Sequence, residues 1–455
     1  MRKLNLLIVA AVMLLTACGN DGWVDLFNGK DFTGFKQLGG DAPYIVEDGC
    51  MVGISKDGVK LNSFMTTEQL YGDFILEFEV WAHPDLNSGV QFRSEARPDG
   101  SVFGYQCEIE SSSRAWAGGL YDEGRRGWLV TNEDKPEAKA AFKVDDWNSY
   151  RIEAIGNNIR IWLNGVNTTN LYDSETATGF IGFQVHSIYT PENDKKQIKW
   201  RNIRIKTTDL ENSRMQGNLT TAINRVPNTL LDEEVAAGWK LLFDGETATG
   251  WRGAHKEAFP ESGWTIKDGQ LIVHKMDGGE STNGGDIVTE EMFGAFELLV
   301  EFKFTEGANS GIKYFVTEQE KGKGSSYGLE YQVLDDGRHP DATQYTSFPG
   351  SRTLASLYDL IPAVENKRAN GPGQWNLARV VVCPNNHVEH WLNGFKTLEY
   401  ERGSDAFREL VKGSKYAAKE YNEHGRFGEA PAGRILLQDH GDEVAFRSIK
   451  IKTLK

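Results

Sequence analysis

The sequence predicts an all-β protein made of two β-sandwich domains in tandem, and three observations support this prediction. First, the chain repeats itself: residues 87–89 (Asn-Ser-Gly) return as residues 309–311, and residues 162–165 (Trp-Leu-Asn-Gly) return as residues 391–394. Second, apolar and polar residues alternate over short runs such as residues 74–80, which is the pattern of half-buried strands. Third, 49 glycines and 12 tryptophans with only 13 prolines fit turn-rich β-structure.

The repeated signatures keep their order along the chain, which indicates a duplicated domain. We expect the first copy at residues 22–207 and the second at residues 236–455. The polar, aperiodic stretch between them, residues 208–235, is expected to be a linker that ends in a short helix within residues 230–237.

Strand patterns follow the same order in both copies. In the first copy we expect strands over residues 89–94, 105–109, 150–154, 158–163, 180–185 and 200–206. In the second copy we expect them over residues 312–317, 329–334, 378–382, 387–392, 434–438 and 446–452. The best helical candidate, residues 405–421, has no equivalent in the first copy and is therefore an elaboration of the shared frame.

The N-terminal residues are predicted to be an export signal, because Arg2 and Lys3 precede the apolar run of residues 4–15. Residues 15–18 (Leu-Thr-Ala-Cys) resemble a bacterial lipobox, so residues 1–18 are expected to be a lipoprotein signal peptide with a lipid on Cys18. The alternative is an ordinary secretory signal. If Cys18 carries a lipid, we expect the protein in the cell envelope, either in the periplasm or on the outer-membrane surface. This lipid is then expected to be its only contact with the membrane.

Charge and cysteine usage exclude several classes of function. With 65 acidic and 50 basic residues the net charge is -15, so a nucleic acid is a poor partner. Cys50, Cys107 and Cys383 form an odd set without metal-ligand spacing, so we expect neither a disulfide framework nor a metal-thiolate site. Nucleophile-elbow, phosphate-loop and zinc-protease motifs are absent from the sequence.

Polar residues at alternate strand positions predict a binding face, because residues i and i+2 of a strand point the same way. Four such pairs recur between the copies: Gln106 with Glu108, Gln184 with His186, Glu330 with Gln332, and Gln438 with His440. Arg93 is expected to share a face with Gln91 and Glu95. Amides, carboxylates and imidazoles beside aromatic residues suit sugars. The alternative is that these side chains satisfy buried backbone groups or line a wet sheet.

Other recurrent residues allow two interpretations. Trp162 and Trp391 each precede an Asn-Gly turn, so each is either a structural residue of a hairpin or a platform for a sugar. The Asn-Ser-Gly motifs are expected to be turns or strand entries first, with any ligand contact second. Acidic groups at residues 335–336, and Asp439 with Asp442, suit a hard cation, although surface turns explain them more simply. No cofactor is assigned, and a divalent cation stays an open alternative.

Taken together, these residues resemble the 3-keto-disaccharide hydrolase domain family over nearly all of the chain after the signal. In the first copy the resemblance lies in residues 26–29, 87–93, 119–123, 147–148, 162–165, 184–186 and 201–205. In the second copy it lies in residues 309–314, 329–336, 339–342, 357–362, 375–376, 390–394 and 437–441.

The resemblance implies a concanavalin A-like or laminin G-like jelly roll in each copy, with a sugar site on the concave sheet. It also implies cleavage of glycosides whose C3 hydroxyl has been oxidised to a ketone. A C3 carbonyl acidifies the neighbouring C2 proton, so a base can remove that proton and the C1 substituent can leave. Such a reaction needs one base, a donor or cation for the enolate oxygen, and an acid for the leaving group.

For this chemistry we select the same kinds of residue in both copies. In the second copy, Glu330 and His440 are expected to be base or acid, Lys313 and Gln332 to lie near the developing oxyanion, and Tyr358 and Gln438 to contact the sugar. In the first copy, Glu108 and His186 are the expected catalytic residues, with Arg93, Gln106, Tyr121 and Gln184 as substrate contacts. The acidic residue of this face therefore stands at different positions in the two copies, one step along the same strand face. The two copies thus either accept different substrates, or one copy has lost catalysis and only binds.

The leading hypothesis is therefore an exported, lipid-anchored enzyme that cleaves 3-keto glycosides. A second hypothesis is a non-catalytic carbohydrate-binding lipoprotein of a glycan-utilisation system, and a third is a structural surface protein. The first two hypotheses both predict that the protein binds a carbohydrate. The sequence does not predict which sugar, which linkage or which oligomeric state.

Overall fold

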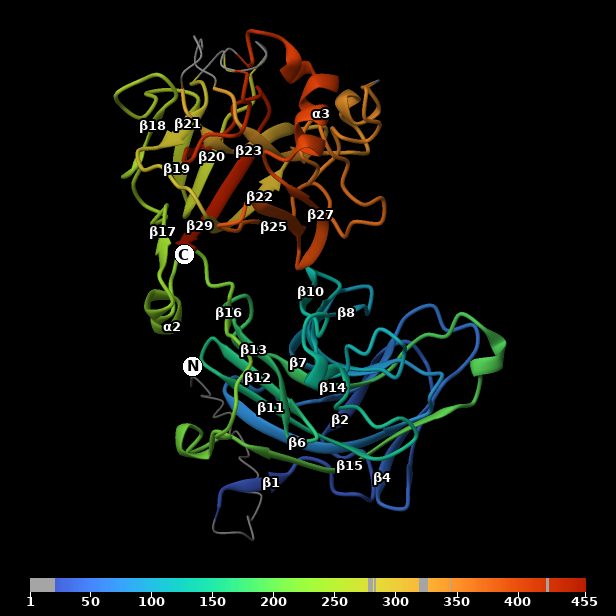
Figure 1. Ribbon diagram of the computed structural model, residues 1–455. Coiled ribbons are helices and arrows are strands. Elements are labelled where there is room, and N and C mark those ends of the chain that lie inside the picture. The colour runs from blue at the N-terminus through green and yellow to red at the C-terminus, as the bar shows by residue number, and fades with distance from the viewer. Residues whose placement is uncertain (1–20, 277–280, 282–283, 319–325, 345, 423–424) are drawn as a thin grey trace, which may run out of the picture. The chain divides into compact units, whose positions relative to one another are not determined.

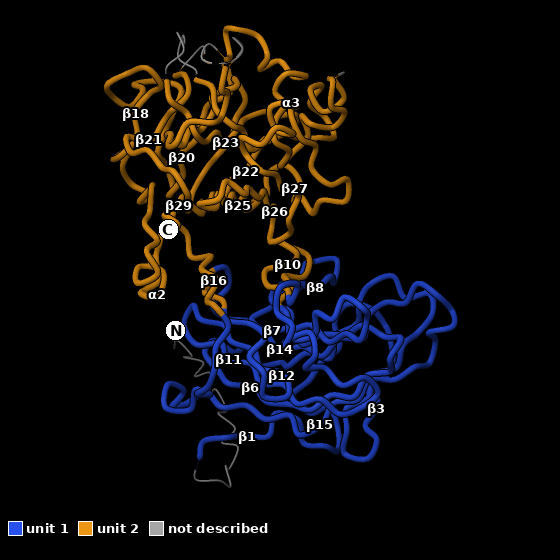
Figure 2. Tube along the Cα trace, viewed as in Figure 1, with its two compact units in different colours: residues 1–119, 132–170, 175–220 blue, residues 120–131, 171–174, 221–455 orange. Residues whose placement is uncertain are grey.

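The computed structural model describes residues 21–276, 281, 284–318, 326–344, 346–422 and 425–455. The predicted signal peptide and Cys18 lie outside the described residues, so the lipid anchor stays a prediction. The chain divides into two compact units, the first made of residues up to 119, 132–170 and 175–220, and the second of residues 120–131, 171–174 and 221–455 (Figure 2). None of the described helices combines the length and the apolar character needed to span a membrane.

The first copy folds into two largely antiparallel sheets, as its alternating pattern predicts (Figure 1). The nine-stranded sheet has the order β16 (Ile223–Asn224), β13 (Val166–Tyr172), β12 (Asn158–Leu163), β11 (Asn148–Ile155), β6 (Phe74–Ala82), β15 (Gln197–Lys206), β4 (Cys50–Ile54) and β3 (Tyr44–Glu47), with β1 (Trp23–Asp25) paired to β15. The seven-stranded sheet has the order β10 (Gly127–Val130), β9 (Leu120–Glu123), β8 (Val102–Ile109), β7 (Ser88–Ala96), β14 (Phe180–Val185), β5 (Ser63–Thr67) and β2 (Phe35–Gly39).

The second copy repeats this plan with the same strand neighbours. Its eight-stranded sheet has the order β19 (Trp264–Lys267), β20 (Gln270–Val273), β29 (Val444–Thr453), β22 (Phe296–Phe304), β25 (Asn376–Val382), β26 (His387–Leu392) and β27 (Phe395–Glu401), with β17 (Trp239–Leu241) paired to β29. Its five-stranded sheet has the order β18 (Trp251–Gly253), β21 (Ile287–Thr289), β28 (Arg434–Leu437), β23 (Asn309–Val316) and β24 (Leu329–Leu334). Both copies are thus jelly-roll β-sandwiches, as predicted.

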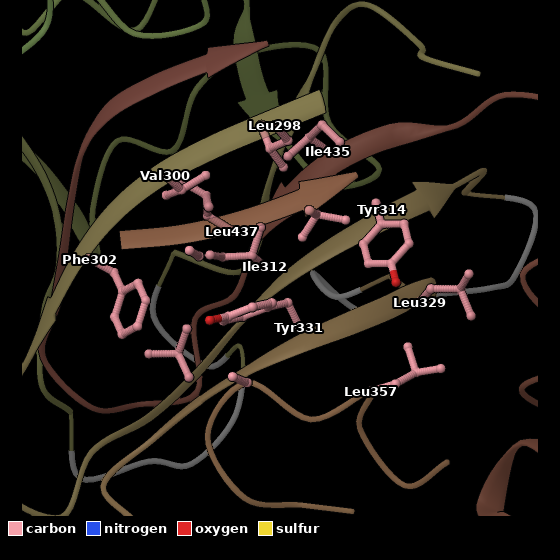
Figure 3. Packing of buried hydrophobic residues seen from close by; sticks show 14 of the residues in the cluster. Leu298, Val300, Phe302, Ile312, Tyr314, Leu329, Tyr331, Leu357, Ile435 and Leu437 are labelled. Atoms are coloured by element: carbon pink, nitrogen blue, oxygen red, sulfur yellow. The ribbon is translucent and has the colours of Figure 1, made fainter. Parts of the chain in front are cut away.

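The core of the second copy lies between its two sheets. Figure 3 shows Phe302 of β22 facing Ile312, Tyr331 and Leu437 of the opposite sheet, and all four side chains are fully buried. In the first copy the Phe78 ring of β6 lies 6.2 Å from the ring of Phe183 on β14, across the same kind of interior. Burial of each such side chain contributes about 1.5–3 kcal/mol, so this packing fixes which strand face is left for polar residues.

Helices are few and short among the described residues: α1 (Pro136–Lys139), α2 (Asp232–Ala236) and α3 (Asp405–Gly413), with 3-10 turns at Pro191–Asn193, Glu211–Ser213, Pro340–Thr343 and Lys415–Ala417. α2 lies within the expected residues 230–237. The helix expected over residues 405–421 is shorter, because Ser414 adopts an extended conformation after Gly413 and only a 3-10 turn follows. The predicted linker is also not wholly irregular, since β16 pairs in parallel with Leu171 and Tyr172 of β13.

Candidate active site in the second copy

A hollow of about 110 Å³ lies on the five-stranded sheet of the second copy. It is lined by Asn309, Lys313, Tyr327, Gly328, Glu330, Tyr358, Lys415, Tyr416, Tyr421, Gln438 and His440. The structure therefore brings together five of the residues selected in this copy, namely Lys313, Glu330, Tyr358, Gln438 and His440.

Strand alternation places these side chains on one face. Ile312, Tyr331 and Leu437 point into the core (Figure 3), so their neighbours along the strands point the other way. Lys313 of β23 and Glu330 of β24 are directly opposite each other in the antiparallel register. The site therefore follows from the register of β23, β24 and β28.

The Asn-Ser-Gly motif builds one wall of the hollow. The Asn309 amide nitrogen lies 3.4 Å from Nε2 of His440, and the Ser310 hydroxyl donates to the carbonyl of Gln438 at 2.8 Å. Gly311 leaves room for Glu330, because a Cβ at this position would lie 2.2 Å from the Glu330 Oε1 atom. The motif was expected to be a turn or strand entry; in the structure its three residues begin β23 and also position the polar side chains.

Lys313 and Glu330 are both nearly excluded from water, with 4% and 5% of their surface exposed. The Lys313 ammonium group lies 3.6 Å from a carboxylate oxygen of Asp286 and donates to the Ser326 carbonyl at 3.2 Å. Asp286 is itself fully buried and accepts from the backbone nitrogen of Asp439 at 2.9 Å. A buried ammonium group with a carboxylate partner is the kind of fixed positive charge that stabilises a developing oxyanion.

Tyr358 is held at the hollow by Asp341, whose carboxylate accepts its hydroxyl at 2.9 Å. Burial, followed by the nearby charges of Glu330 and Asp341, raises the pKa of Tyr358 well above its usual range, so the phenol stays protonated. Arg352 pairs with Asp341 and Asp359 at 3.0 and 2.8 Å and fixes this loop. The Lys415 ammonium group lies 4.3 Å from the centre of the Tyr358 ring.

Gln332 lies beside the hollow rather than in its lining. Its side chain is fully buried, and its amide lies 3.2 Å from the Asn309 side-chain oxygen and 3.3 Å from the Glu330 carboxylate. This residue was expected near the oxyanion. The structure instead places it against Glu330, where it can orient that carboxylate.

Three residues at one end of the hollow can hold a metal ion. These residues are His339, His440 and Asp442, and each offers one ligand atom. The three ligand atoms lie within 4.8 Å of one another. Two imidazoles and one carboxylate suit a first-row transition metal better than calcium. Asp335 and Asp439 were also considered as cation ligands from the sequence. The Asp335 carboxylate accepts a hydrogen bond from the backbone nitrogen of Gly307 at 2.8 Å, and that of Asp439 accepts one from the backbone nitrogen of Gly285 at 3.0 Å. Such bonds are typical of carboxylates that stabilise turns.

Several residues in or beside the hollow were not among those selected from the sequence. Asn309 and His339 belong to motifs that carried the family resemblance, so recurrence and resemblance together contained a signal for them. Lys415, Tyr416 and Tyr421 lie on residues 402–433, which join β27 to β28 and have only residues 173–179 as their counterpart in the first copy. Trp162 and Trp391 lie on β12 and β26, in the sheets opposite these polar faces, which favours the structural interpretation.

In the first copy the corresponding face is closed by side-chain amides. Gln106 accepts from Gln91 at 3.1 Å and from Gln184 at 3.0 Å, and donates to Glu108 at 3.2 Å. Gln106, Glu108 and Gln184 thus lie together, as alternation predicts. Glu108 also accepts from Asn87 at 2.7 Å.

Glu108 is the one selected residue of this face that carries a strongly shifted pKa. Burial raises the pKa of its carboxyl group to about 7, although the hydrogen bond from Asn87 and the positive charge of Arg114 act in the opposite direction. Only 3% of the residue is exposed. The group is therefore a proton-accepting carboxylate that water hardly reaches.

Arg93, Tyr121 and His186 make contacts with other residues of the first copy. The expectation for Arg93 is wrong, because a β-bulge between Phe92 and Glu95 breaks the alternation. Its buried guanidinium group donates to the carbonyls of Gly72 and Gly156 and to Asp73. The His186 ring contacts the Ser187 carbonyl and Tyr189, and the Tyr121 ring packs on Trp128 at 5.1 Å.

Comparisons with known proteins agree with the duplicated architecture. The model of the 3-keto-alpha-glucoside-1,2-lyase-like domain family matches residues 22–206 and 238–452. A 3-keto-disaccharide hydrolase of Bacteroides thetaiotaomicron is 39% identical over 237 residues, which are 48% of this chain and 79% of that protein. Two crystal structures of candidate glycosyl hydrolases from Parabacteroides distasonis are 31% and 27% identical, with TM-scores of 0.43 and 0.35. They cover 50% and 48% of this chain, and 100% and 99% of their own. The chain belongs to the 3-keto-alpha-glucoside-1,2-lyase-like domain family and carries two copies of its domain.

Proposed function

We propose that the second copy cleaves the glycosidic bond of 3-keto glycosides, with a 3-keto disaccharide as substrate. The observation that carries this proposal is the pair formed by Lys313 and Glu330. The two residues lie opposite each other on adjacent strands, and both side chains are almost completely buried. They line a hollow that is also lined by His440. The reaction needs a base beside a fixed positive charge, and this pair supplies both. The similarity to a protein named 3-keto-disaccharide hydrolase supports the same substrate class.

In the proposed reaction the Glu330 carboxylate removes the C2 proton. The electron pair of the broken C2–H bond forms a C2=C3 double bond, and the negative charge moves onto the C3 oxygen. The Lys313 ammonium group stabilises this charge, because it lies in a water-poor environment where such an interaction is strong. The Lys313–Asp286 contact of 3.6 Å keeps the ammonium group in place.

In the second step the enolate re-forms the C3 carbonyl and a C1=C2 bond, and the C1–O bond breaks with its electron pair on the leaving oxygen. His440 gives that oxygen a proton. Water then adds its hydroxyl group to C1 and a proton returns to C2, so the net reaction is hydrolysis. Gln438 and Tyr358, which line the same hollow, contact the sugar hydroxyls in this proposal.

A divalent cation fits the donor set of His339, His440 and Asp442. When bound, it would supply a second positive charge at this end of the hollow, and His440 would then serve as ligand rather than as acid.

The proposal is tested by incubating the full chain with a disaccharide and with its 3-keto form, with and without a chelator, and following release of the second sugar. We expect release from the 3-keto form alone. Loss of activity with chelator would assign His440 to a bound cation, and unchanged activity would assign it as acid. Cleavage of both disaccharides at similar rates, or binding of the 3-keto form without turnover, would contradict the proposal.

A further inference from the structure

A second, larger hollow adjoins the candidate active site. Its volume is about 330 Å³, and it shares Tyr327, Gly328 and Tyr421 with the first hollow of about 110 Å³. The two hollows are therefore neighbours on either side of a common wall. The remaining lining includes the side chains of Glu420, Asn422 and Arg426.

The common wall is aromatic and firmly packed. The rings of Tyr327 and Tyr421 meet edge to face, with centroids 4.8 Å apart and planes at 75°. Tyr416 of the first hollow stacks on Phe427 of the second, with centroids 4.0 Å apart and planes at 14°. Such ring contacts stabilise the fold beyond the burial of area, so the wall is a built element of the fold.

The far rim of the second hollow is also fixed. Arg402 donates to the carbonyls of Gly428 and Ala430 at 2.8 and 3.0 Å, and its guanidinium group lies 3.9 Å from the centre of the Phe315 ring. Glu429 pairs with Arg408 of α3 at 2.9 Å. The helix that has no equivalent in the first copy therefore serves to hold this rim.

Most of the second hollow lies on residues 402–433, the connection between β27 and β28. In the first copy the matching strands, β13 and β14, are joined by residues 173–179 only. The second hollow is therefore specific to the copy whose polar face carries Lys313 and Glu330. An elaboration next to the reacting groups is expected to serve the part of the substrate that does not react.

We propose that the second hollow is a leaving-group subsite, which binds the second sugar ring of a 3-keto disaccharide while the oxidised ring occupies the first hollow. The inference rests on the proposed function. Aromatic faces pack on the C–H faces of a sugar ring. Glu420, Asn422 and Arg426 offer an acceptor, an amide and a donor fork for its hydroxyl groups. The second hollow adjoins the first at Tyr327, Gly328 and Tyr421, so a second ring can extend into it, whereas a methyl leaving group would not reach it.

The experiment compares kcat/KM for a 3-keto disaccharide with kcat/KM for the methyl glycoside of the same oxidised sugar. The double variant Glu420→Ala, Arg426→Ala removes two exposed side chains that line only the second hollow. The variant loses the hydrogen bonds of both side chains to the second ring, so we expect the ratio of the two kcat/KM values to fall about tenfold or more. Lys412→Ala on α3, an exposed residue that lines neither hollow, is the matched control and should keep the wild-type ratio.

The outcomes separate the two proposals. If the wild-type chain cleaves both substrates and the double variant keeps the wild-type ratio, the subsite assignment is wrong and the proposed function stands. If the wild-type chain cleaves neither, the proposed function falls and the subsite assignment falls with it. Circular dichroism of the variants checks folding, and a folded double variant with a tenfold lower ratio supports the subsite.

Discussion

The two copies place different residues at the same three strand positions. The pair Lys313 opposite Glu330 in the second copy becomes Gln91 opposite Gln106 in the first, and the second copy's Gln332 becomes Glu108. The second copy therefore holds a cation and a carboxylate at its hollow, whereas the first holds amides that bond to each other.

This difference shows that two copies of one fold can keep the same strands while carrying different reactive groups at matching positions. In the first copy the only carboxylate of these three positions, Glu108, accepts hydrogen bonds from Asn87, Gln106 and Arg114. No lysine replaces Lys313. The positive charge beside Glu108 belongs to Arg114, which pairs with both Glu108 and Glu110 at 3.2 and 3.0 Å, so an enolate formed there would face a cation already shared by two carboxylates. We therefore expect the first copy to bind carbohydrate or support the fold, and the second copy to carry the turnover.

The largest expected effect comes from removing the carboxylate in each copy separately. Glu330→Gln should lower kcat on a 3-keto disaccharide about 10²–10⁴-fold, which is the usual contribution of a positioned general base. Glu108→Gln should change it less than about twofold, because the first copy has glutamine at the position of Lys313 and its Arg114 is already paired with Glu108 and Glu110. Single-turnover measurements of both variants in the full chain check the contrast. Equal losses in the two variants would mean that the first copy also turns over substrate.

A second expected effect concerns the pH dependence of stability in the first copy. Burial raises the pKa of Glu108 from its ordinary 4.5 to about 7, so the folded state binds this proton more tightly than the unfolded state. The stabilising contribution is therefore complete below about pH 4.5 and is lost as pH rises through 7. The loss amounts to roughly 3 kcal/mol at most.

Chemical denaturation of wild type and Glu108→Gln across pH 4.5 to 8 measures this loss. The unfolding free energy of wild type minus that of the variant should decrease with rising pH up to about 7 and then level off. A difference that is constant with pH, or that increases, would show that the folded state does not raise the pKa of Glu108. Asp99, an exposed carboxylate of the same copy, provides the control as Asp99→Asn, since its pKa lies below the ordinary value.

The sandwich architecture could be predicted from the sequence because burial alone determines strand alternation. The expected strands over residues 158–163 and 329–334 have the observed bounds, and the face that carries Lys313 and Glu330 follows directly from the buried neighbours of these residues. Recurrence between the copies singled out the same strands. Predictions that depended only on period two and on burial therefore agree with the structure.

Predictions failed where the backbone departs from regular alternation. Arg93 has a positive φ of 45°, and the bulge beside it turns its side chain away from the expected face. Lys415 and Tyr421 reach the hollow from a long connection whose path depends on packing such as the Tyr416–Phe427 stack, which has no periodic signature. His339 lies beside His440 through loop geometry alone.

The smallest expected effect concerns the glycine of each Asn-Ser-Gly motif. A Cβ at Gly311 would lie 2.2 Å from the Glu330 carboxylate, and a Cβ at Gly89 would lie 2.5 Å from the Gln106 amide. Overpacking of this kind costs about 1–3 kcal/mol, so Gly311→Ala and Gly89→Ala should lower the unfolding free energy of their own copies by similar amounts.

The same two variants should differ in turnover. Gly311→Ala displaces the base and should lower kcat. Gly89→Ala disturbs the Gln106 hydrogen bonds to Gln91, Gln184 and Glu108 and should leave kcat near that of wild type. Thermal unfolding and turnover of both variants check this. A kcat that falls equally in the two variants would show that the first copy's amide network matters to the reaction. The sharp division of roles between the copies would then be wrong, because an intact first copy would be needed for catalysis in the second.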